Sequence, residues 1–70
     1  MANDHITQTL AIRDWVLFRV GQRLPINANI LAGEFGISPR QAKRYITTIN
    51  AHYGLRLVFD FGRKTYRRGP

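Results

Sequence analysis

Cysteine is absent from this 70-residue sequence, which excludes disulfide bonds and thiolate zinc sites. Packing must therefore hold the fold together. No apolar run approaches the roughly 18 residues that a membrane span needs. The first residues also lack the basic and apolar blocks of a signal peptide, so we expect a cytoplasmic protein.

Acidic residues are scarce: four stand against eleven basic ones, which leaves a net charge of +7. Residues 1–39 are neutral overall. Residues 40–70 carry the whole excess, and Asp60 is the one acidic residue among them. A segment this basic predicts a polyanionic partner, such as DNA, RNA or an acidic membrane surface.

Signatures of catalysis and cofactor binding are missing as well. The four carboxylates form no pair at general acid–base spacing, and no nucleophile pattern or phosphate-binding glycine loop occurs. His5 and His52 lie far apart without neighbouring ligands. We therefore expect no enzyme, no catalytic residue, no metal, no cofactor and no small-molecule effector.

Glycine, proline and N-cap residues divide residues 1–70 into the segments of a single domain. We expect, in order, a helix over about 6–20, a short strand over 24–26, a helix over 28–35, a helix over 39–53 and a hairpin over 55–68. The third helix has the clearest start, because Ser38, Pro39 and Gln41 form a capping box with proline at the first position. Gly21 is suited to a left-handed residue at the end of the first helix.

The third helix and the hairpin each show a clear periodicity. On the helix, an apolar stripe for the core consists of Ala42, Ile46, Ile49 and Tyr53. In the hairpin, Leu55, Leu57, Phe59 and Phe61 alternate with Arg56, Val58 and Asp60, a period of two that is typical of a strand. A two-residue turn at Gly62-Arg63 would pair Phe59 with Tyr66 and Asp60 with Thr65.

This order of elements is that of a winged helix-turn-helix, mainly α with a small β-hairpin. Leu31-Ala32, Phe35-Gly36-Ile37-Ser38, the basic helix after them and a hairpin ending in Tyr66-Arg67 carry a resemblance to a known family. Over these residues the chain resembles the DNA-binding module of DeoR-type regulators and the N-terminal domain of the biotin repressor. It departs from their pattern at Gly33, which weakens the second helix.

We therefore expect a sequence-specific double-stranded DNA-binding protein, nucleoid-associated, which acts as a small stand-alone transcriptional regulator or repressor of phage or mobile-element type. The third helix would enter the major groove, where arginine can contact guanine in a bidentate manner. Its candidate DNA-binding residues are Arg40, Gln41, Lys43, Arg44, Thr47 and Thr48. The wing would contact phosphates or the minor groove through Arg63, Lys64, Arg67 and Arg68. The start of the second helix, at Asn27 and Ala28, would hold a phosphate.

Several alternatives stay open at this point. The basic helix face would serve only solubility if it contacts nothing, and charge on the hairpin also protects a strand edge. Ile12, Trp15 and Phe18 form the face of a homodimer on the first helix, or Trp15 simply fills the core. Other functions are a DNA-bending architectural or excision factor, an RNA-binding or ribosome-associated protein, and a winged-helix protein-interaction module.

Overall fold

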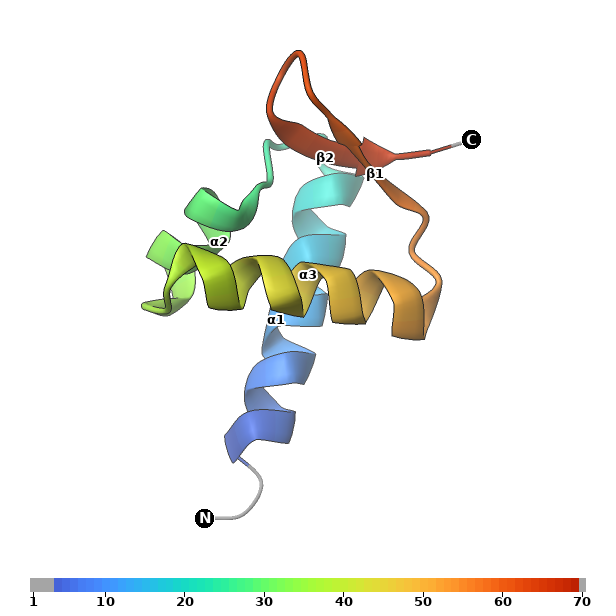
Figure 1. The fold of residues 1–70 in the computed structure, drawn as a ribbon. Helices are drawn as coiled ribbons and strands as arrows, with labels where there is room; N and C mark the ends of the chain where they lie inside the picture. Colours follow the sequence, from blue (N-terminus) through green and yellow to red (C-terminus); the bar gives the residue numbers. More distant parts are fainter. Residues whose placement is uncertain (1–3, 70) are drawn as a thin grey trace.

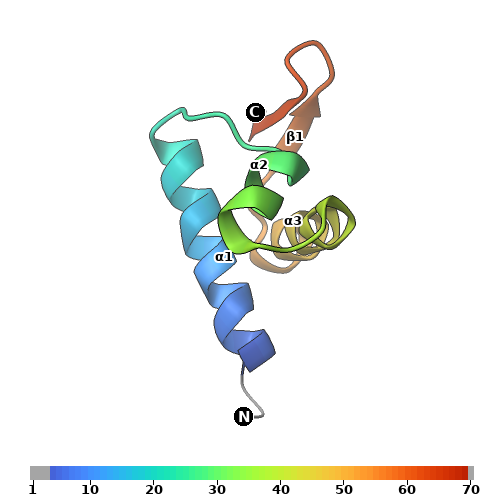
Figure 2. The ribbon, with the colours of Figure 1, turned by 90° about the vertical axis from the view of Figure 1, so that its left-hand side faces the viewer.

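Figure 1 shows three helices followed by a two-stranded antiparallel hairpin in the computed structural model, which describes residues 4–69. The elements are α1 (Asp4–Gly21), α2 (Ala28–Phe35), α3 (Pro39–Tyr53), β1 (Leu57–Asp60) and β2 (Thr65–Arg68). This is the α+β layout of a winged helix-turn-helix, in which the hairpin is the wing. In Figure 2, α1 runs along one side of the molecule, and α3 is seen nearly end-on at the other side, below the hairpin. Within the described residues, no helix has the length and apolar character to cross a membrane.

Local sequence signals account for the ends of α2 and α3, whose predicted bounds are confirmed. At the start of α3, the Ser38 hydroxyl accepts a hydrogen bond from the Gln41 backbone N–H at 3.1 Å. The Gln41 side-chain oxygen accepts one in return from the Ser38 backbone N–H at 3.2 Å, which completes the capping box. Gly36 ends α2 with a left-handed φ of 65°. The helix α1 is longer than the predicted 6–20 and starts at Asp4.

Ten buried apolar residues form one core between the three helices and the base of the hairpin. They are Ile12, Val16, Ile26, Leu31, Ala32, Ala42, Ile46, Ile49, Leu55 and Leu57. The predicted core stripe of α3 is correct except at Tyr53, which is 38% exposed. The Tyr53 ring lies instead under the Arg13 guanidinium, whose central carbon is 4.9 Å from the ring centroid. Its ring therefore meets a side chain from α1 at the edge of the core.

The hairpin has the predicted register but a different turn. Phe59 pairs with Tyr66 and Asp60 with Thr65, as expected. The predicted two-residue turn at Gly62-Arg63 is wrong, because β1 ends at Asp60 and β2 begins at Thr65, so that four residues, 61–64, connect them. The Asp60 carboxylate stabilises this longer turn by accepting hydrogen bonds from the backbone N–H groups of Gly62 at 3.0 Å and Arg63 at 3.2 Å. Lys64, with φ of 58°, is the left-handed residue of the turn.

The connection between α1 and α2 differs from the prediction in two respects. No strand forms over 24–26, although the Tyr66 N–H donates to the Ile26 carbonyl at 2.8 Å. One hydrogen bond does not make a ladder, and Pro25 has no N–H to offer a second. The left-handed residue after α1 is Arg23, with φ of 58°, and not Gly21. The Leu24 N–H then donates to the Arg19 carbonyl at 2.8 Å and closes the helix end.

Gly33 and Gly36 give a matched test of backbone conformation in the helix-turn-helix. A Cβ added at either position would meet no heavy atom within 4 Å. Gly33 lies inside α2, so Gly33→Ala should raise the free energy of unfolding by about 0.5–1 kcal/mol. Gly36 has a φ of 65°, so Gly36→Ala should lower the free energy of unfolding by about 1–2 kcal/mol. Urea denaturation measures both, and shifts of the same sign would contradict this account.

Candidate nucleic-acid interface

The outer face of α3 carries the six residues predicted to contact DNA from this helix, and all six are exposed. Five of them line one shallow hollow to which no other element contributes: Arg40, Lys43, Arg44, Thr47 and Thr48. The buried stripe of α3 occupies the opposite side of the helix. The structure therefore brings these five side chains together on a surface that projects away from the core.

The basic side chains on this face are unpaired within the described part of the chain. Across residues 4–69, the side chains of Arg40, Lys43 and Arg44 take part in no hydrogen bond or ion pair. The first turn of α3 also lacks an acidic residue. A cation near a helix N-terminus opposes the helix dipole, and such terms amount to about 0.3–1 kcal/mol. The start of α3 is thus an electrostatically unfavourable arrangement that an external anion would stabilise.

The arginine side chains of α1, in contrast, form hydrogen bonds with other groups of the chain. Arg13 forms an ion pair with Asp14, with 2.9 Å between Nη2 and Oδ1. The hydrogen bonds that the Arg13 guanidinium donates to the Asp14 carboxylate raise the pKa of Arg13. Arg19 donates from Nε to the Pro25 carbonyl at 2.9 Å. The cations of α1 therefore have partners within the chain, whereas Arg40, Lys43 and Arg44 on α3 have none among residues 4–69.

Gln41 differs from the other candidate residues of α3, because its side chain belongs to the capping box. Its side-chain oxygen lies 3.2 Å from the Ser38 N–H and 3.4 Å from the Ser38 hydroxyl. The hollow that Gln41 borders is a separate one, which it shares with Thr9 from α1 and with Arg44. The structure gives Gln41 a role in fixing the start of α3.

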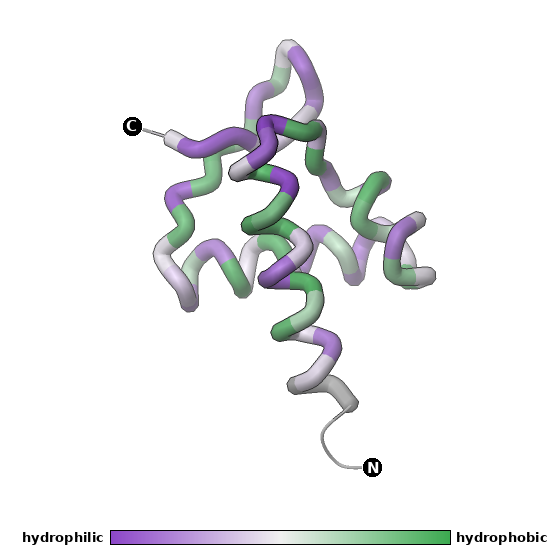
Figure 3. The backbone as a smooth tube through the Cα atoms, turned by 180° about the vertical axis from the view of Figure 1, so that it is seen from behind, coloured by the Kyte–Doolittle hydropathy of each residue, from purple (hydrophilic) through white to green (hydrophobic). Residues whose placement is uncertain are grey.

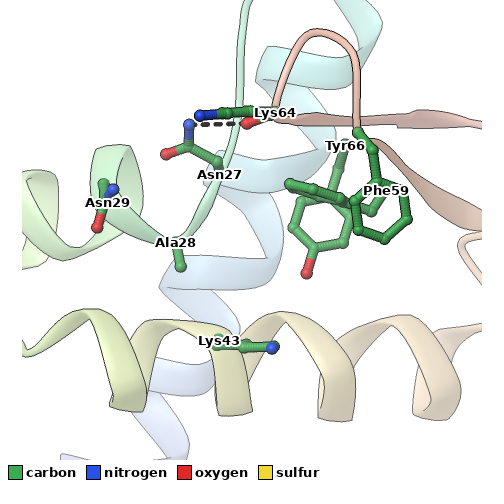
Figure 4. A pocket seen from close by; sticks show the side chains of 8 residues that line it. Asn27, Ala28, Asn29, Lys43, Phe59, Lys64 and Tyr66 are labelled. Carbon is green, nitrogen blue, oxygen red and sulfur yellow. Dashed lines mark hydrogen bonds between the residues drawn. The ribbon is translucent and has the colours of Figure 1, made fainter.

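A cleft of about 590 Å³ lies between the wing, the start of α2 and the side of α3 (Figure 4). Its lining residues are Asn27, Ala28, Asn29, Lys43, Phe59, Phe61, Lys64 and Tyr66. Lys43 borders the cleft from α3, and Lys64 borders it from the hairpin turn on the opposite side. The cleft thus joins candidate residues from all three predicted regions: α3, the wing and the start of α2.

Asn27 connects the start of α2 to the wing. Its side-chain oxygen accepts a hydrogen bond from the Ile30 N–H at 2.8 Å, which is the predicted N-cap. Its side-chain amide donates to the Lys64 carbonyl at 3.0 Å (dashed in Figure 4). Both polar atoms of the Asn27 side chain are therefore used within the fold. This leaves the backbone around Ala28 as the part of the helix start that can meet a phosphate.

Asn50 is the positioning residue that the sequence reasoning missed. Its side-chain oxygen accepts from the Leu57 N–H at 2.8 Å, and its amide donates to the Leu57 carbonyl at 3.1 Å. These two hydrogen bonds resemble those between paired residues of a β-sheet, with the Asn50 side-chain amide in place of the neighbouring strand's backbone. A signal existed, because Asn50 follows Ile46 by one helical turn and borders the apolar stripe formed by Ile46 and Ile49.

The four predicted wing residues are exposed, but they divide between two sides of the hairpin. Lys64 borders the cleft that faces α3. Arg63, Arg67 and Arg68 border a hollow on the side facing the end of α1. Arg68 donates from Nε to the Leu55 carbonyl at 3.4 Å, and the end of β2 is a continuous hydrophilic stretch in Figure 3. Arg68 therefore also stabilises the base of the hairpin.

The dimer face predicted on α1 is wrong in part. Ile12 has no exposed surface and belongs to the core, so it cannot form an intermolecular contact. Trp15 packs edge-on against Phe35, with ring centroids 5.9 Å apart, because α1 lies against α2 there. Phe18 is 61% exposed, and it is the one member of the predicted trio that fully reaches the surface.

Comparisons with models of known protein families, with curated proteins and with solved structures found no match to this chain. Its fold and its surface are therefore the basis for any assignment of function.

The double hydrogen bond of Asn50 predicts a clear stability effect. Asn50→Ala leaves the Leu57 N–H and carbonyl without this partner, which should lower the free energy of unfolding by about 1–3 kcal/mol. For a domain of this size, each 1 kcal/mol corresponds to a fall of about 4–8 °C in Tm. Calorimetry or circular dichroism measures the change. Asn29→Ala is the matched control, because Asn29 is exposed on α2. Equal effects of the two substitutions would contradict the role given to Asn50.

Proposed function

We propose that this protein binds double-stranded DNA in a sequence-specific manner and acts as a small transcriptional regulator. The observation that carries the proposal is the cluster of exposed, unpaired cations on one face of α3, next to a basic wing. An ordinary solvated helix face mixes charges of both signs, but α3 contains no acidic residue. The resemblance to DeoR-type modules agrees with this surface.

In the proposed complex, α3 lies in the major groove with its N-terminal half against the bases. A groove about 12 Å wide accepts a helix. Arg40 and Arg44 reach base edges, where a bidentate contact to guanine discriminates by about 1–3 kcal/mol. Thr47 and Thr48 are short enough to let the backbone approach, and they contact thymine methyl groups or phosphates.

The cleft beside α3 accommodates the DNA strand that separates the major groove from the adjacent minor groove. Lys43 and Lys64 border it on opposite sides, so a phosphate between them is attracted by both. The start of α2 adds backbone N–H groups near Ala28. Arg63, at the tip of the hairpin, then lies over the minor groove, whose negative potential attracts its guanidinium.

Selection from a pool of random duplex DNA tests this function. The expected result is enrichment of a defined sequence that binds in preference to bulk DNA and to duplex RNA. An A-form RNA duplex has a major groove too narrow for α3, so it should compete weakly. Stronger binding to RNA, or no enrichment from the pool, would contradict the proposal.

Arg44→Ala should weaken binding to the selected site by about 1–3 kcal/mol and relax the preference for that site, because Arg44 reads a base. Arg63→Ala should weaken binding to all sequences more evenly, because Arg63 contacts the backbone or the groove. Fluorescence anisotropy against the selected site and a scrambled duplex measures both effects. Arg23→Ala, which removes the same charge from the connection before α2, is the control. An Arg44→Ala protein that keeps the full preference would contradict the role given to Arg44.

Binding should depend steeply on salt, since about four to seven phosphates would be neutralised. We expect the logarithm of the association constant to fall with the logarithm of the salt concentration at a slope of about −4 to −6. Lys64→Ala should make that slope less steep by about one. A slope near zero for the unmodified protein would show that phosphate contacts do not drive binding.

A further inference from the structure

Phe61 is the most exposed large apolar residue of those described, and it stands at the tip of the wing. Its side chain is 82% exposed. It lies in the turn between Asp60 and Gly62, two residues before Arg63. Exposed apolar residues are common on protein surfaces, but an aromatic ring on a basic turn is a poor choice for solubility alone.

The ring of Phe61 is held by other aromatic residues rather than left free. Its centroid lies 5.0 Å from that of Phe59, with the two ring planes at 80°. Phe59 in turn contacts Tyr66 across the hairpin, with centroids also 5.0 Å apart. Edge-to-face contacts of this kind stabilise the orientation of each ring. The Asp60 carboxylate fixes the backbone that follows by accepting from Gly62 and Arg63.

The position of Phe61 places it on the side of the wing that faces α3. Phe61 borders the same cleft as Lys43 and Lys64. Val58 lies on the opposite face of the hairpin, because alternate residues of a strand point to opposite faces and Phe59 faces the cleft. The exposed ring and the cations proposed to hold phosphates therefore lie on one surface.

We propose that Phe61 is a wedge that enters a base step from the minor groove and bends the bound duplex. This inference rests on the DNA-binding function proposed above. Apolar side chains inserted from the minor groove partly unstack a base step and kink the duplex by about 20–90°. The local charge favours DNA as the occupant over an apolar protein surface, because Arg63 and Lys64 belong to the same turn as Phe61 and Lys64 borders the same cleft. The cations would hold the two strands while the ring separates the bases.

Two fluorescence measurements on the selected duplex test the wedge. Energy transfer between dyes at the two ends of a duplex of about three helical turns reports bending. A 2-aminopurine substituted in turn at positions beneath the wing reports unstacking through its rise in emission. The variants are Phe61→Ala, Phe61→Leu and, as the matched control, Val58→Ala, which shortens an exposed apolar residue of the same hairpin.

The wild-type protein and Val58→Ala should bend the duplex by at least about 20° and increase the 2-aminopurine emission. Phe61→Leu should retain most of both effects, because leucine is also an apolar wedge. Phe61→Ala should lose both while its affinity changes by less than about tenfold, since the unstacking cost disappears together with the contact. Circular dichroism checks that each variant is folded.

Three results would overturn the inference, and the third differs from the first two in what it leaves standing. A wild-type protein that binds the selected site without bending or unstacking it refutes the wedge alone. Equal bending by Phe61→Ala and the wild type does the same. A protein that binds no duplex at all refutes the wedge together with the DNA-binding function.

Discussion

The double hydrogen bond between Asn50 and Leu57 fixes the relative position of the two parts of the candidate interface. Asn50 belongs to α3, and Leu57 begins the wing. A two-stranded hairpin is marginally stable by itself, so it needs this support from the helices. Asn27 provides a second attachment from α2 to the carbonyl of Lys64. Since one amide side chain holds the base of the wing and another holds its turn, the cations of α3 and of the wing keep a constant geometry.

The distribution of charge shows a conflict between stability and the proposed function. Arg13 of α1 pairs with Asp14, and Arg19 donates a hydrogen bond to the Pro25 carbonyl, so both have partners within the chain. The cations on the outer face of α3 have none among residues 4–69, and Arg40 lies in the first turn of α3, where the helix dipole disfavours it. A 70-residue chain without cysteine has a small free energy of unfolding. Uncompensated cations on α3 are therefore best explained by a binding partner that compensates them. Under the proposed function, the phosphate backbone of DNA would provide that compensation.

The sequence predicted those features that depend on a few neighbouring residues. The capping box of Ser38 and Gln41 and the glycine that ends α2 are local, and the bounds of α2 and α3 followed from them. The exposure of the basic face of α3 followed from its helical periodicity. The predicted turn of the wing was wrong because the hydrogen bonds of the Asp60 carboxylate, rather than the flexibility of Gly62, determine its length. The contact of Asn27 with Lys64 and the burial of Ile12 depend on residues distant in sequence, which local patterns do not reveal.

Amide chemical shifts, followed by nuclear magnetic resonance during titration with the selected duplex, test the central claim most directly. The account predicts that the largest changes fall on the first half of α3, on the start of α2 and on the wing turn over residues 61–64. The exposed face of α1, on the other side of the molecule, should change little. Changes concentrated on α1, or spectra that DNA leaves unaltered at low salt, would contradict the account.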